Sequence, residues 1–140
     1  MPQKLKILVI RFSSIGDIIL TTPVIRCLNI QLNADVDFLT KGKYQTLLSS
    51  NPYVNEIFIL GQETKPMLKN LRDKHYDFVI DLQNNFRSLR VRLNLGVQSY
   101  IYQKNNFKRY ILIYLGVNLL NNHIVDRYFK SVLKLNVHND

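Results

Sequence analysis

The stretch that decides the fold is Lys4 to Asp17, KLKILVIRFSSIGD, in which an aliphatic run ends at a short polar loop. The run from Lys4 to Ile10 closes with four consecutive aliphatic residues, which is typical of a strand buried in a parallel sheet. Beyond the loop, apolar residues recur at helical spacing up to about Leu32, and Thr21 to Pro23 predict a kink or a late helix start. This part of the chain therefore reads as strand, loop and helix.

The same alternation continues along the chain. Further strands are predicted at Asp35–Leu39, Glu56–Leu60, Asp77–Leu82 and, at an edge, Gln98–Gln103. Helices are predicted at Tyr44–Ser49, Thr64–His75 with Thr64 as cap, Asn85–Leu95, Phe107–Leu115 and His123–Leu135. Alternating short strands and helices predict an α/β fold, a Rossmann-like doubly wound parallel sheet, formed by residues 1–140 as one domain. Ligands of such sheets bind beyond the carboxyl ends of the strands, where the loops Arg11–Asp17 and Asp81–Arg87 lie.

Composition agrees with a folded protein, since 46% of the residues are hydrophobic and 21% are charged. The single cysteine, Cys27, excludes an internal disulfide and suggests a small buried residue in a reducing compartment. The first apolar run, Ile7 to Ile10, is too short for a signal peptide or a membrane span. We therefore expect a cytoplasmic protein.

The net charge of +9 is concentrated in the second part of the chain. Residues 82–140 carry 9 Lys and Arg against 2 Asp and Glu, whereas residues 1–81 carry 10 against 8. The excess favours an anionic partner: nucleic acid, lipid headgroups, or a phosphorylated or carboxylated substrate. The cations and aromatics between Tyr100 and Tyr110 allow nucleic-acid or membrane binding, although such a mixture is more often a solvated helix face.

Each of the two loops allows a structural and a functional reading. Asp17 in the first turn of a helix is stabilised by free amides and the helix dipole, typically by ~0.3 to 1 kcal/mol, and spacing alone favours this role. A carboxylate at the mouth of a sheet could instead act as a general base. In the second loop, Gln83 and Arg87 suit sugar hydroxyls or an anion, whereas Asn84 or Asn85 could simply cap a helix. The three histidines are scattered, which argues against a metal site.

Three ordered stretches resemble the ADP-heptose:lipopolysaccharide heptosyltransferases, glycosyltransferase family 9. They are KILVIRFSSIGDIILTTPVIRCL at Lys6–Leu28, DFVIDLQNNFRS at Asp77–Ser88 and HIVDRY at His123–Tyr128. The first is the most specific, because it carries nearly every element of the family's opening pattern, K-I-L-x-I-R/K-x-S-S-I/L-G-D-x-x-x-T-x-P. The second departs from the family, which commonly has glycine after its histidine or glutamine. Here Asn84 stands there, a residue that tolerates left-handed backbone.

The resemblance implies the N-terminal, acceptor-side half of a GT-B architecture, with the nucleotide-sugar-binding C-terminal domain missing and little activity by this chain alone. It implies that Asp17 is the base of an inverting transfer of heptose, or a related sugar, to a lipopolysaccharide-core or related glycolipid acceptor. The implied acceptor-side residues are Ser13, Ser14, Gly16, Gln83, Asn84, Arg87 and Arg127.

No cofactor or metal is implied, and the donor substrate of the full enzyme is a nucleotide sugar such as ADP-heptose. The expected partners are an anionic glycolipid and, peripherally, the cytoplasmic face of the inner membrane, whereas nucleic acid is not expected. A rival reading is a non-catalytic Rossmann-like module that binds anionic glycans or membrane surfaces.

Overall fold

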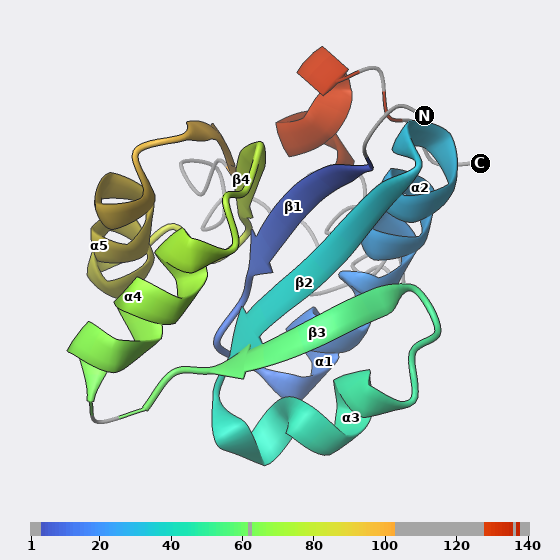
Figure 1. The fold of residues 1–140 in the computed structure, drawn as a ribbon. Helices are drawn as coiled ribbons and strands as arrows, with labels where there is room; N and C mark the ends of the chain where they lie inside the picture. Colours follow the sequence, from blue (N-terminus) through green and yellow to red (C-terminus); the bar gives the residue numbers. More distant parts are fainter. Residues whose placement is uncertain (1–3, 62, 103–127, 136, 138–140) are drawn as a thin grey trace, which may run out of the picture.

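A five-stranded parallel sheet forms the centre of the molecule. The computed structural model describes residues 4–61, 63–102, 128–135 and 137. The sheet order is β3-β2-β1-β4-β5, and every neighbouring pair is parallel (Figure 1). The strands are β1 (Leu5–Ile10), β2 (Ala34–Thr40), β3 (Val54–Ile59), β4 (Phe78–Asp81) and β5 (Gln98–Ile101). The strand order turns back between β1 and β4, which makes the loops after these strands the switch point of a doubly wound fold. The predicted fold class is confirmed.

Helices cover both faces of this sheet. They are α1 (Ile15–Ile19), α2 (Thr22–Leu32), α3 (Gln45–Ser49), α4 (Thr64–Asp73) and α5 (Phe86–Leu95), with short 3-10 turns η1 (Gly42–Tyr44) and η2 (Leu133–Leu135). Figure 1 shows α4 and α5 side by side on one side of the sheet, away from α2 and α3. Residues 128–132 form a helical turn before η2.

Alternate side chains of the strands pack into two separate hydrophobic cores, one on each face of the sheet. In β1, Ile7 and Val9 pack with α2 and the helical turn at 128–132, while Leu8 and Ile10 pack with α4 and α5. All four of these β1 side chains are fully buried. A strand covered on both faces explains why the decisive run is continuously aliphatic and does not alternate with polar residues.

A buried polar network ties β2 to its neighbours on the α4 side. Asp37 accepts hydrogen bonds from the Tyr76 hydroxyl at 2.6 Å and from the Asn55 amide at 3.0 Å. Burial raises the pKa of the Asp37 carboxyl, and the two hydrogen bonds act in the opposite direction. Asp37 is thus a buried carboxyl group whose hydrogen-bond partners offset part of the cost of burying it.

Element bounds differ from the predicted ones by a few residues. The segment after β1 is two helices, because α1 ends at Ile19 and α2 begins at Thr22, so the predicted kink before Pro23 is present. The prediction that Thr64 caps α4 is wrong: Glu63 is the N-cap, with extended backbone, and Thr64 is the first helical residue. The predicted helix Phe107–Leu115 and the cations Lys104, Lys108 and Arg109 lie outside the described residues.

One stretch of the described chain, Ile15–Leu32, is long and apolar enough to cross a membrane by length and composition. It is interrupted between α1 and α2, and its side chains Ile18, Val24, Ile25 and Leu28 are fully buried against the sheet. Cys27 is buried there too, as predicted. The stretch therefore serves as a core element of this fold.

Candidate functional site

The two loops singled out in the sequence meet at the switch point of the sheet. The Phe12 backbone amide, after β1, donates a hydrogen bond to the Gln83 side-chain oxygen, after β4, at 3.0 Å. Arg11 crosses the same gap, since its Nη1 donates to the Leu82 carbonyl at 2.8 Å. The residues that follow two strands far apart in sequence are therefore joined at the carboxyl edge of the sheet.

At this edge of the sheet, the Asp17 carboxylate is hydrogen-bonded through one of its two oxygens. Its Oδ2 atom accepts from Arg11 Nη2 at 2.9 Å and from the Ser14 hydroxyl at 3.1 Å. The Asp17 side chain is 28% exposed, so the carboxylate is neither buried nor fully solvated. Among the described residues, no hydrogen bond reaches Oδ1. The two hydrogen bonds to Oδ2 fix the orientation of the carboxylate.

The structural role of Asp17 is present as well. Ser14 is the N-cap of α1, and the Asp17 side chain points back to the Ser14 backbone as in a capping box. The ion pair with Arg11 and the capping contact use the same Oδ2 atom. Capping and a chemical role are therefore compatible in this geometry.

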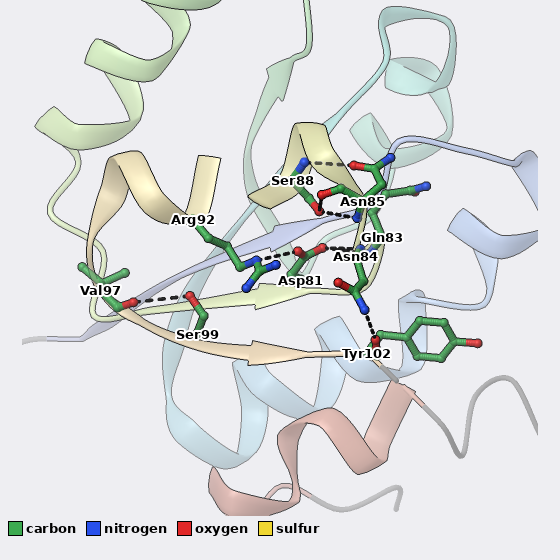
Figure 2. Close-up of polar contacts among 9 residues, drawn as sticks. All are labelled: Asp81, Gln83, Asn84, Asn85, Ser88, Arg92, Val97, Ser99 and Tyr102. Carbon is green, nitrogen blue, oxygen red and sulfur yellow. Dashed lines mark hydrogen bonds and ion pairs between the residues drawn. The ribbon is translucent and has the colours of Figure 1, made fainter. Parts of the chain in front are cut away.

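The β4–α5 loop is shaped by Asp81 at the end of its strand (Figure 2). Asp81 Oδ1 accepts from the backbone amides of Gln83 at 3.0 Å and Asn84 at 2.8 Å. Its Oδ2 lies 2.8 Å from Arg92 Nε of α5, an ion pair held by charge, because the two atoms do not meet hydrogen-bond geometry. Asp81 is fully buried, so this interaction takes place away from water.

Asn84 has the left-handed backbone, φ 53°, that its residue type allows. Its side chain donates to the Tyr102 carbonyl at 3.0 Å, which links the loop to the end of β5. Asn85 caps α5 and exchanges two hydrogen bonds with Ser88, each of 2.9 Å. The capping alternative is thus correct for Asn85, while Asn84 serves the turn.

A cleft opens beside this loop and brings together Ser13, Gln83 and Arg87 from the predicted set. It has a volume of about 250 Å³, and its lining comprises Phe12, Ser13, Lys41, Gln83, Asn85, Phe86 and Arg87. A larger hollow of about 600 Å³ shares Lys41 and Arg87 with it and is also lined by Arg90 and by the apolar side chains of Leu60, Met67, Leu68 and Val91. Together they form a basic cleft with an apolar floor.

Some predicted residues do not line this cleft. Asp17, Ser14 and Gly16 lie beside it on α1 and its cap, and Gly16 has neither a left-handed backbone nor a neighbour that would exclude a side chain. Arg127 lies outside the described residues. The described residues contain no cluster of three or more His, Cys, Asp or Glu side chains able to hold a metal ion.

Sequence reasoning missed four residues of this region: Arg11, Lys41, Arg90 and Tyr128. Lys41 directly follows β2, and Arg90 lies one helical turn after Arg87, so the carboxyl-end rule and helical spacing were the available signals. Tyr128, from the third family-like stretch, is buried and packs edge-on against Tyr102 with ring centroids 5.0 Å apart. Burial raises the pKa of the Tyr128 hydroxyl. The positive charge of Arg11 lowers this pKa and the negative charge of Asp17 raises it, so Tyr128 lies close enough to the Arg11–Asp17 ion pair to interact with it electrostatically.

Comparisons with known proteins point to one family. No protein-family model matches the chain. Lipopolysaccharide heptosyltransferase 1 of Campylobacter coli is 25% identical over 111 residues, 74% of this chain and 32% of that protein. The solved structure of E. coli ADP-heptose lps heptosyltransferase II is 34% identical, with a TM-score of 0.60 over 66% of this chain and 29% of that one.

Two further structures show the same fold at 17% identity. One is E. coli heptosyltransferase WaaC with ADP, with a TM-score of 0.71 over 97% of this chain and 48% of that one. The other is a glycosyl transferase family 9 protein of Veillonella parvula, with a TM-score of 0.68 over 99% of this chain and 44% of that one. The chain spans about a third of the length of the curated relative that it matches. These similarities confirm the predicted relationship to the heptosyltransferases of glycosyltransferase family 9.

Proposed function

We propose, starting from this relationship, that the chain is the acceptor-binding part of an inverting glycosyltransferase. In this proposal it transfers heptose or a related sugar from a nucleotide sugar, such as ADP-heptose, to a lipopolysaccharide-core or related glycolipid acceptor in the cytoplasm. Ser13, Gln83 and Arg87 contact the acceptor, and Asp17 is the catalytic base.

The observation that carries the proposal is the one-sided anchoring of Asp17 beside the cleft. Arg11 and Ser14 hold Oδ2, which leaves Oδ1 to take the proton of an acceptor hydroxyl. As that proton moves to Oδ1, the hydroxyl oxygen forms a bond to the anomeric carbon of the donor. The bond from that carbon to the nucleotide diphosphate breaks, and the diphosphate leaves with the electron pair. A single displacement of this kind inverts the anomeric configuration.

The lining of the cleft supports an anionic acceptor. Arg87, Arg90 and Lys41 approach it from two different elements, and guanidinium groups bind carboxylates and phosphates through paired hydrogen bonds. The apolar floor suits the carbon face of a sugar ring. Nucleotide-sugar binding is assigned to a second domain, and we expect the 140 residues assayed by themselves to show negligible turnover, because preorganised donor contacts supply much of the acceleration.

Acceptor binding is tested first by following amide chemical shifts of the 140-residue chain during titration with a soluble, phosphorylated lipopolysaccharide inner-core oligosaccharide. Saturable shifts centred on residues 11–17 and 83–90 are expected, and random DNA should not reproduce them. Arg87→Gln should weaken binding, whereas Arg72→Gln, an exposed arginine in the last turn of α4, should not. Equal shifts with DNA and oligosaccharide would overturn the acceptor site.

The base assignment is tested in a two-domain protein made by joining this chain to the nucleotide-sugar-binding half of a heptosyltransferase relative. Asp17→Asn should lower kcat by about 10²- to 10⁴-fold and change the acceptor KM little, because proton removal is lost while binding remains. Asp35→Asn, on the surface of β2, is the matched control. An unchanged kcat for Asp17→Asn would refute the base assignment and leave Asp17 with only its structural contact to Ser14 at the start of α1.

A further inference from the structure

The outer face of α5 has a composition that its packing does not require. The inner face of α5 packs against the rest of the fold, since Ser88 and Val91 are buried and Arg92 pairs with Asp81. On the outer face Phe86 is 90% exposed and Leu93 is 74% exposed, the two highest values among the exposed large apolar side chains of the described residues. They lie two turns apart on one side of the helix.

These two side chains form part of one continuous surface. They line a shallow groove of about 430 Å³ together with Leu89, Arg90 and Asn94. Arg87 and Arg90 are exposed between Phe86 and Leu93 along the helix. Single exposed apolar residues are ordinary on a protein surface, but an aromatic and an aliphatic side chain that share a groove with an arginine, Arg90, indicate a contact surface.

We infer that the outer face of α5 docks on the surface of an anionic lipid bilayer. Phe86 and Leu93 enter the boundary between headgroups and acyl chains, and Arg90, which lines the same groove, pairs with lipid phosphates. The net charge of +9 adds long-range attraction to such a surface. A second copy of the chain fits less well, because a two-fold contact through this face would place Arg87 and Arg90 against the same cations of the other copy.

Docking through α5 has a consequence for the cleft. Phe86 and Arg87 lie at the N-terminal end of α5 and also line the cleft beside Gln83. The opening of the cleft is therefore held next to the bilayer, where the sugar of a lipid-anchored acceptor would be. The inference deepens the proposed function, but the docking itself requires no acceptor.

The test uses the absence of tryptophan from the 140-residue sequence. Phe86→Trp creates a single reporter on α5, and Ile30→Trp creates a matched reporter on α2, where Ile30 is 52% exposed. Each variant is mixed with vesicles of phosphatidylcholine and with vesicles of equal parts phosphatidylcholine and phosphatidylglycerol, both free of glycolipid. With the anionic vesicles, emission of the Phe86→Trp variant should shift to the blue and become protected from a soluble quencher, whereas the Ile30→Trp reporter should stay solvated.

Vesicle flotation measures the affinity independently. The double change Phe86→Ser and Leu93→Ser should lower partition onto anionic vesicles by about tenfold or more, because two apolar side chains no longer enter the boundary. Ile30→Ser should leave partition unchanged. Since the vesicles lack an acceptor, this result stands apart from the oligosaccharide titration, and either can fail while the other succeeds.

Three outcomes would overturn the inference. One is an equal spectral shift of both tryptophan reporters. Another is anionic-vesicle binding that the double serine change leaves intact, which would reduce the attraction to net charge alone. The third is a concentration-dependent dimer that the double serine change dissolves, which would assign the face to a second copy of the chain.

Discussion

Removing the Asp81 carboxylate should destabilise the fold more than any other single polar change near the cleft. Asp81 is fully buried, its partner Arg92 is only 14% exposed, and the pair is 2.8 Å apart. Breaking a buried pair by deleting one partner typically costs ~3 to 5 kcal/mol, because the remaining charge loses its compensation. Asp81→Asn keeps an oxygen for the loop amides, and we place it at the lower end, about 3 kcal/mol, because Arg92 can turn partly toward water.

Asp81→Ala should cost more than Asp81→Asn, because it also removes the acceptor of the Gln83 and Asn84 amides. Buried donors left without a partner add ~1 to 3 kcal/mol. The change should therefore loosen the β4–α5 loop, and with it the contact between Gln83 and the Phe12 amide.

Urea unfolding followed by circular dichroism measures both variants against Asp73→Asn, an exposed carboxylate of α4 that should alter stability by no more than about 0.5 kcal/mol. Amide shifts of Phe12 and Asn84 report the loop separately. If both Asp81 variants lose less than about 1 kcal/mol of unfolding free energy, the reasoning is refuted, because the Arg92 charge would then not need its buried partner.

Three further changes test other parts of the structure. Asp37→Asn should reveal a pH dependence: because burial raises the folded pKa of Asp37, its contribution to stability is full below its usual value of 3.8 and is lost as the pH rises through the raised value. Urea unfolding across the acidic range should show wild-type stability falling relative to Asp37→Asn as the pH rises, and a constant difference would contradict this. Thr40→Val should raise the unfolding free energy by about 1 kcal/mol, since the Thr40 hydroxyl is buried without a hydrogen-bond partner among the described atoms; destabilisation in thermal melts would count against it. Asn84→Ala should cost about 1 to 2 kcal/mol through its left-handed backbone, and Asn84→Gly should cost less; the reverse order in urea unfolding would exclude backbone strain as the cause.

Much of the architecture was predictable because strands and helices of a doubly wound fold are local in sequence. The aliphatic run ending at Ile10 predicts β1 to within one residue, and the strand pattern alone predicts that the two loops lie at the carboxyl ends of β1 and β4. The turn at Asn84 was also readable, because few residue types accept its backbone. The cap of α4 was not, since Glu63 and Thr64 are both polar residues before a proline and only the backbone distinguishes them.

The candidate site could be predicted only in part. Residues 13–17 and 83–87 were found from their positions after strands, and their functional roles stay predictions. Lys41 directly follows a strand and Arg90 lies one helical turn after Arg87, but these positions alone do not show that both side chains line one cleft, which depends on how the end of β2 packs near α5.

The sequence by itself determined which segments are strands, that the sheet is parallel and covered on both faces, and which family the opening motif resembles. Tertiary structure alone decided that Arg11 donates a hydrogen bond to one oxygen of Asp17 and that Asp81 pairs with Arg92. The physical reason is range: hydrophobic periodicity and turn chemistry act over a few neighbouring residues, and so leave a local signature. Charge pairing and cleft shape depend on side-chain positions that exist only once distant segments have packed together.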